Sequence, residues 1–308
     1  MRDRRTTGGQ LLHSVTVLGF VALVGCADAE DPPVVVERVV TPAVLTFDGA
    51  DYATDAAMVA HGERLANVLA CGSCHMPDYS GANFGEIIPL VGGLWATNIS
   101  RTLPSFSDPE LERLLREGVH PDREIYLMPS KLSQWLGDQD MAALIAYLRT
   151  IPPTGDPTPP PPAGFEEAVT ERLPEDYWRT TPGGAPRTYH NATEEAEYFA
   201  TNAPPDYGAE LAQGRLVALT TCAGCHGAAL DGVGEPAGGI QAFLDYGDAD
   251  ARRLLREGQD RYGDLVPPTW IPDEAGTDHV FPDLTDGEVD AVIAYVRRLA
   301  AERYAAGV

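Results

Sequence analysis

The pattern Cys-x-x-Cys-His occurs twice in this chain, at Cys71–His75 and at Cys222–His226, and it constrains the fold more than any other feature. Each copy is followed by the same signals in the same order, first Leu-Leu-Arg-Glu-Gly and then Ile-Ala-Tyr. A proline-rich stretch, Pro152–Pro162, lies between the two copies. The simplest explanation is an internal repeat of one domain, with an extended, polyproline-like spacer as the boundary.

Each copy is predicted to consist of short helices joined by irregular loops, because no segment alternates convincingly as a strand. Apolar residues at helical spacing predict a helix over residues 56–70 that runs into the first cysteine motif. A capping box at Ser107–Glu110 begins a second helix, and Gly118 ends it. Closing helices are predicted over residues 138–150 and after Thr285. The expected fold is therefore all-α, with two tandem domains joined by a Pro-rich linker.

These signals divide the chain into five segments. They are a signal peptide (1–25), an acidic, proline-bearing tether (26–49), a first domain (50–153), a Pro-rich linker or wrap (154–205) and a second domain (206–304).

The N-terminus has the organisation of an export signal. A short basic segment, Met1–Arg5, precedes an apolar run, Leu11–Val24, that is too short for a transmembrane helix of about 20 residues. The sequence Leu23–Cys26 resembles the lipobox of bacterial lipoproteins, in which the cysteine is acylated and becomes the mature N-terminus. The alternative is an ordinary cleaved signal with an incidental cysteine. We expect an exported lipoprotein, anchored to a membrane through Cys26 and facing the periplasm.

The repeated motif is the signature of covalent haem attachment. Two thiols one helical turn apart can each add to a haem vinyl group, and the next histidine can bind the iron. A disulfide or a thioredoxin-type redox pair would not require that histidine, and a four-cysteine zinc site would have to join two separate repeats. The sequence therefore predicts two covalently bound haems c, held by Cys71, Cys74, His75, Cys222, Cys225 and His226.

The sixth iron ligand differs between the copies. Met128 is the candidate in the first copy, and a core methionine is the alternative interpretation. The second copy contains no methionine, and Val266 stands at the place that corresponds to Met128. His279 is either the distal ligand of the second iron or a histidine of a surface loop, and both interpretations stay open. His61 and His120 are interpreted as solvated or capping residues. His190 is a distant candidate for the distal ligand.

The chain resembles the class I cytochrome c family. Its first repeat is most similar to the cytochrome c subunits of membrane-bound alcohol and sugar dehydrogenases. The resemblance covers residues 50–153 well and 206–304 more loosely. The residues that carry it are Cys71–His75, Gly92–Gly93, Thr97–Ser100, Phe106–Asp108, Leu115–Gly118, Met128–Pro129 and Ala143–Pro153. It implies that a proline carbonyl after each motif orients the proximal histidine, and Pro89 and Pro236 are the matching positions.

The leading hypothesis is a lipid-anchored dihaem carrier that transfers electrons from a periplasmic dehydrogenase or quinol-linked donor towards a terminal acceptor. We expect an electron-transfer protein or a non-catalytic subunit, so no catalytic residue is assigned. The alternative is a dihaem peroxidase-like enzyme with an open or labile second haem, for which Glu235, Asp278 and His279 are acid–base candidates. A sensor with a five-coordinate second haem is a third hypothesis.

The charge balance bears on partners. The chain has 22 lysine and arginine residues against 46 aspartate and glutamate residues, a net charge of −24. This excludes nucleic acid and anionic lipid headgroups as default partners. It is consistent with a redox partner that presents a basic docking patch, and equally with a merely solvated acidic surface.

Overall fold

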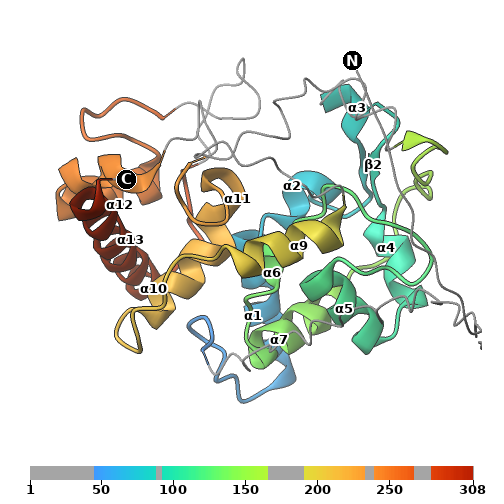
Figure 1. Cartoon of the computed structure of the whole chain (residues 1–308). Coiled ribbons are helices and arrows are strands. Elements are labelled where there is room, and N and C mark those ends of the chain that lie inside the picture. The colour runs from blue at the N-terminus through green and yellow to red at the C-terminus, as the bar shows by residue number, and fades with distance from the viewer. Residues whose placement is uncertain (1–44, 88–91, 166–190, 233–238, 267–278, 308) are drawn as a thin grey trace, which may run out of the picture. The chain divides into compact units, whose positions relative to one another are not determined.

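The computed structural model describes residues 45–87, 92–165, 191–232, 239–266 and 279–307, all within one compact unit that spans Thr41–Val308 (Figure 1). Helices predominate in these residues, which confirms the all-α prediction. The strands described are β1 (Ala82–Asn83) and β2 (Trp95–Ala96), which pair antiparallel. Strands of two residues show no alternation of polar and apolar side chains, so the sequence pattern could not indicate them.

In the first domain, the helix that precedes the cysteine motif packs against the closing helix. These are α1 (Asp55–Val68) and α7 (Asp138–Leu148). Shorter helices lie between them in the chain: α2 (Cys71–His75), α3 (Phe84–Ile87), α4 (Ile99–Thr102), η2 (Leu103–Ser105), α5 (Asp108–Glu117) and α6 (Ser130–Ser133). The predicted capping box of α5 is formed, and Gly118 ends the helix in a left-handed conformation.

The second domain repeats this order after α9 (Ala192–Thr201). Its elements are α10 (Ala212–Val217), the π-helix η3 (Ala218–Cys222), α11 (Ala223–His226), η4 (Ile240–Asp245), α12 (Asp248–Glu257) and α13 (Asp286–Ala306). Helix α10 packs against the closing helix α13, as α1 packs against α7. Most of the buried apolar side chains described in the two domains belong to one continuous core.

In each domain, one glycine allows the first helix to cross the closing helix at close range. A Cβ atom at Gly62 would lie 1.9 Å from the carbonyl oxygen of Ala143, and one at Gly214 would lie 2.0 Å from that of Ala291. Neither distance is sterically allowed, so only glycine lets these backbones approach so closely. Gly62 and Gly214 therefore occupy equivalent positions in the two domains, although neither lies in one of the matched sequence motifs.

Gly62→Ala is expected to destabilise the haem-loaded protein by about 2–3 kcal/mol, because the added methyl group must push the two helices apart. The measurement is denaturant unfolding followed by circular dichroism. Gly247→Ala is the control, because the nearest atom to a Cβ there lies 3.5 Å away. Equal unfolding midpoints for the two variants would contradict the close-packing argument.

The repeated Leu-Leu-Arg-Glu-Gly segment has a structural role in both domains. Its arginine ties the end of one helix to the start of the closing helix. Arg116 donates to the carbonyl oxygen of Leu136 at 2.6 Å, and Arg256 donates to that of Leu284 at 2.8 Å. Each guanidinium also pairs with an aspartate in the first turn of the closing helix, Asp138 and Asp286 respectively. Both copies therefore assemble through the same contacts.

The described parts of the segment between the domains lie against the first domain. The Asn98 side chain donates to the carbonyl oxygens of Thr154 and Asp156, at 2.8 and 2.9 Å. Helix α9 packs on α5 and α6, and its Glu195 pairs with Lys131 at 2.7 Å. These parts of the segment are thus held in place by hydrogen bonds and an ion pair.

The two domains also contact each other through side chains. Helix α6 of the first domain contacts η3 and α11 of the second, and a Cβ atom at Gly224 would lie 3.2 Å from Leu132. The guanidinium of Arg215 lies 5.5 Å from the ring centroid of Trp135. No helix in the described ranges has the length and apolar character that a membrane span requires.

Candidate functional site

The first cysteine motif lines a cavity of about 430 Å³ in the first domain. Cys71, Cys74 and His75 contribute from α2, and Met128 contributes from the loop before α6. Most other lining residues are apolar, among them Leu69, Phe84, Leu94, Ile99, Leu111 and Leu115. An apolar cavity that brings together two thiols, an imidazole and a thioether suits a haem with its iron between His75 and Met128.

The His75 imidazole is held in one orientation. Its Nδ1 atom donates a hydrogen bond to the carbonyl oxygen of Thr97 at 2.7 Å, which leaves Nε2 for the iron. Burial lowers the pKa of His75 and the hydrogen bond to Thr97 partly opposes this, so the ring suits its role as a neutral ligand.

Among the described residues, the acceptor for His75 is the carbonyl oxygen of Thr97. It lies there because β2 pairs with β1 and ends at Ala96, which places the next residue beside the ring. Pro89 and Pro236 themselves lie outside the described residues.

The four cysteines of the two motifs form no disulfide with one another. Burial raises the pKa of the Cys71 thiol to about 12 and that of Cys222 to about 11. Burial also raises the pKa of Cys74. Before haem is attached, these three side chains are therefore thiols and not thiolates at neutral pH.

The structure distinguishes Met128 from the other described methionines. Met141 is 1% exposed and belongs to the apolar core. Met76 is 41% exposed, and Met58 lies on α1 away from the cavity lining. Leu127 adopts a positive φ of 59°, and Met128 follows it into the cavity wall. Among the described methionines, only Met128 lines this cavity.

The second motif is followed by the same loop as the first. The Gly232 amide donates to the His226 carbonyl oxygen at 2.9 Å, as the Gly81 amide donates to that of His75 at 2.9 Å. Left-handed residues stand at matched places, with φ of 61° at Leu230 and 59° at Tyr79. The backbone therefore presents His226 as it presents His75.

His279 lies beside His226 although 52 residues separate them in the sequence. Their ring centroids are 6.0 Å apart and the ring planes are inclined by 64°. Two imidazoles that bind one metal ion from opposite sides, with metal–nitrogen bonds of about 2 Å, place their centroids roughly 6 Å apart. The spacing fits an iron between the two rings, and it also fits a direct edge-to-face contact of the two rings. The structure therefore brings His279 to the second motif, where it can serve as the distal ligand.

The interpretation of His61 as a solvated or capping residue was wrong. Its ring is buried and its Nε2 lies 2.7 Å from the carboxylate of Asp140, which also accepts the Phe47 amide. The pairing depends on the α1–α7 contact, so the sequence around His61 could not indicate it. His120 is partly buried, lines the first cavity and accepts the Asp122 amide at Nδ1.

His190, Glu235 and Asp278, as well as Cys26, lie outside the described residues. Sequence reasoning also missed Thr97 and Arg123, which act at the first cavity. Both come from irregular loops, where no local pattern indicates a function.

A comparison with protein-family models matches the chain to the cytochrome c model over residues 59–152 and 211–300. Each match contains one Cys-x-x-Cys-His motif. The first match includes the whole closing helix α7, and the second includes α13 as far as residue 300. A search of curated proteins finds no match.

Proposed function

Because the chain belongs to the cytochrome c family, we propose that it is an exported, lipid-anchored dihaem electron carrier. In this proposal it accepts electrons from a periplasmic dehydrogenase or quinol-linked donor and passes them towards a terminal acceptor. The resemblance of the first repeat to cytochrome c subunits of membrane-bound alcohol and sugar dehydrogenases supports a dehydrogenase as the donor. The net charge of −24 supports a partner with a basic docking patch.

The two cytochrome c domains carry two covalently bound c-type haems, haem 1 in the first domain and haem 2 in the second. Their irons supply reversible one-electron chemistry. The chain attaches haem 1 through Cys71 and Cys74 and orients His75 through Thr97. It attaches haem 2 through Cys222 and Cys225, with His226 as the proximal ligand.

The observation that carries the proposal is the contact between α6 and α11. Helix α6 begins two residues after Met128, and α11 contains the second half of the haem 2 motif. Leu132 on α6 packs against Gly224, which lies between the two cysteines of that motif. The distal side of haem 1 and the attachment helix of haem 2 are thus joined by direct packing, which supports electron transfer between the haems within one chain.

The ligand sets support a direction for that transfer. A methionine ligand raises the reduction potential of a haem by favouring Fe(II), which here applies to haem 1 and Met128. Two histidines at haem 2 give a lower potential, and the spacing of His226 and His279 supports this ligation. Electrons would then pass from the second domain to the first.

The spacing of the two histidines also bears on the enzyme hypothesis. A dihaem peroxidase needs an open or labile position on one iron. With His279 on the far side of the haem 2 iron, that position is filled, so the observation supports the carrier over the enzyme.

The proposal is tested by low-temperature electron paramagnetic resonance of the oxidised, haem-loaded protein. Two low-spin signals of equal intensity are expected, because both irons have six ligands. A stoichiometric high-spin signal that shifts when peroxide or azide is added would overturn the carrier proposal in favour of the enzyme.

Cys26→Ser is expected to release the protein from the membrane fraction, because acylation at Cys26 is the proposed source of attachment. The measurement is fractionation of cells followed by haem staining. Ser14→Ala, a change in the apolar run that keeps the cysteine, is the matched control. Equal membrane recovery of the two variants would remove the lipid anchor from the proposal.

A further inference from the structure

Arg123 is the one lysine or arginine among the described residues that line the haem 1 cavity. It is partly buried, and burial lowers the pKa of its guanidinium without bringing it near neutrality. Among the described residues, no carboxylate forms an ion pair with it. A cation that faces an apolar cavity without an acidic partner is costly unless a ligand brings the negative charge.

A hydrogen bond of Arg123 connects it to the proximal side of the haem site. Its Nη2 donates to the Thr97 hydroxyl oxygen at 3.0 Å, and the Thr97 carbonyl oxygen accepts from His75. One threonine thus connects the guanidinium to the proximal iron ligand. Among the described residues, the Thr97 hydroxyl oxygen is the one hydrogen-bond acceptor of Arg123, so its other N–H groups can bind a ligand at the cavity wall.

The charged and titratable groups around Arg123 do not neutralise it. Asp122 and Glu124 also line the cavity and are exposed, but neither pairs with Arg123. The positive charge of Arg123 adds to desolvation in lowering the pKa of His120, so that ring is neutral beside it. Arg123 therefore provides the one fixed positive charge among the described residues of this cavity wall, and no described carboxylate pairs with it.

Haem c retains two propionate carboxylates after its vinyl groups have been joined to cysteines. A guanidinium binds a carboxylate through two parallel N–H donors, which is the strongest neutralising contact that a side chain offers. We infer that Arg123 binds a propionate of haem 1 and, through Thr97, positions His75. The contact between Arg123 and the propionate is separate from the proposed carrier function, because it does not depend on which proteins exchange electrons with this one.

The positive charge has a predictable effect on the iron. Oxidation of the iron adds one positive charge to the haem, and a nearby guanidinium disfavours that state. Arg123→Gln is therefore expected to favour the oxidised form of haem 1 by about tenfold, which corresponds to a midpoint potential lower by about 59 mV for one electron. Haem 2 should keep its potential.

The test uses the full, haem-loaded chain and a redox titration that resolves the two haems by electron paramagnetic resonance. Resonance Raman spectra provide a second readout, since the bending modes of the propionates report their hydrogen bonding. Arg101→Gln is the matched control. It removes one charge from the same domain, but Arg101 is exposed, contacts the Gly155 carbonyl oxygen and does not line the cavity. A haem 1 potential and propionate modes in Arg123→Gln equal to those of Arg101→Gln would overturn the inference.

Arg123→Lys keeps the test decisive if Arg123→Gln does not bind haem. Lysine preserves the charge but cannot form the paired contact. We expect shifted propionate modes in Arg123→Lys together with a haem 1 potential close to that of the wild type, because the positive charge is retained. Propionate modes identical to the wild type in Arg123→Lys would also count against the assignment.

Discussion

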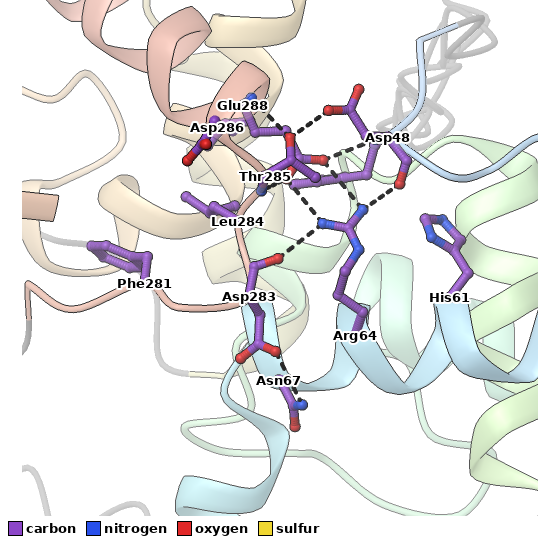
Figure 2. A network of polar contacts seen from close by, with 12 residues as sticks. Asp48, His61, Arg64, Asn67, Phe281, Asp283, Leu284, Thr285, Asp286 and Glu288 are labelled. Carbon is purple, nitrogen blue, oxygen red and sulfur yellow. Dashed lines mark hydrogen bonds and ion pairs between the residues drawn. The ribbon is translucent and has the colours of Figure 1, made fainter. Parts of the chain in front are cut away.

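Glu288→Ala is expected to lower the free energy of unfolding by about 3 kcal/mol, because it removes the buried acid of an ion pair between the domains. The Glu288 carboxylate is fully buried on α13 and pairs with Arg64 on α1 at 2.9 Å (Figure 2). It also accepts the backbone amides of Asp48 and Thr285, each at 2.8 Å. The value lies at the low end for a buried pair because one-fifth of the Arg64 side chain stays exposed and Arg64 keeps the Asp283 carbonyl oxygen as a partner.

The measurement is denaturant unfolding of the haem-loaded protein, with Glu110→Ala as the matched control. Glu110 has the same capping-box role in α5, with Ser107, but it is exposed and has no partner among the described residues of the other domain. Loss of a capping residue alone costs about 1 kcal/mol. A cost for Glu288→Ala no greater than that of Glu110→Ala would show that the contact with Arg64 adds nothing.

His279→Ala is expected to convert haem 2 from low-spin to high-spin in the oxidised protein, because the iron loses its sixth ligand. The midpoint potential of haem 2 should change as well, and the low-spin signal of haem 1 should persist. Both are followed in one titration monitored by electron paramagnetic resonance.

Two further variants sharpen this test. His279→Met offers a thioether at the same place, and its low-spin haem 2 should have a higher potential than the wild type. His120→Ala is the matched control, since His120 lines the haem 1 cavity and should leave haem 2 unchanged. An unchanged haem 2 potential and spin state in His279→Ala would remove His279 from the ligand set.

Features that depend on neighbouring residues were predictable. The haem motifs are short and their chemistry is local, so the sequence indicated both of them. The capping boxes at Ser107 and Thr285 also act within one turn, and both are formed as predicted. Met128 was identified because few methionines compete for its role, and the structure places it in the cavity wall.

Features that depend on residues far apart in the sequence were not predictable. Arg64 and Glu288 are separated by 224 positions, and His61 and Asp140 by 79. Thr97 reaches His75 only because β2 returns to pair with β1, which brings the residue after β2 to the ring. No periodicity or motif encodes such pairs.

The sequence by itself determined that this chain folds into two helical domains and attaches a haem in each, because attachment and helix capping need only residues within a few positions. Only the tertiary structure decided which carbonyl orients His75, which cation lines the cavity of the first motif and which histidine lies beside His226. These depend on loops that meet when the helices pack, and packing is a property of the whole chain.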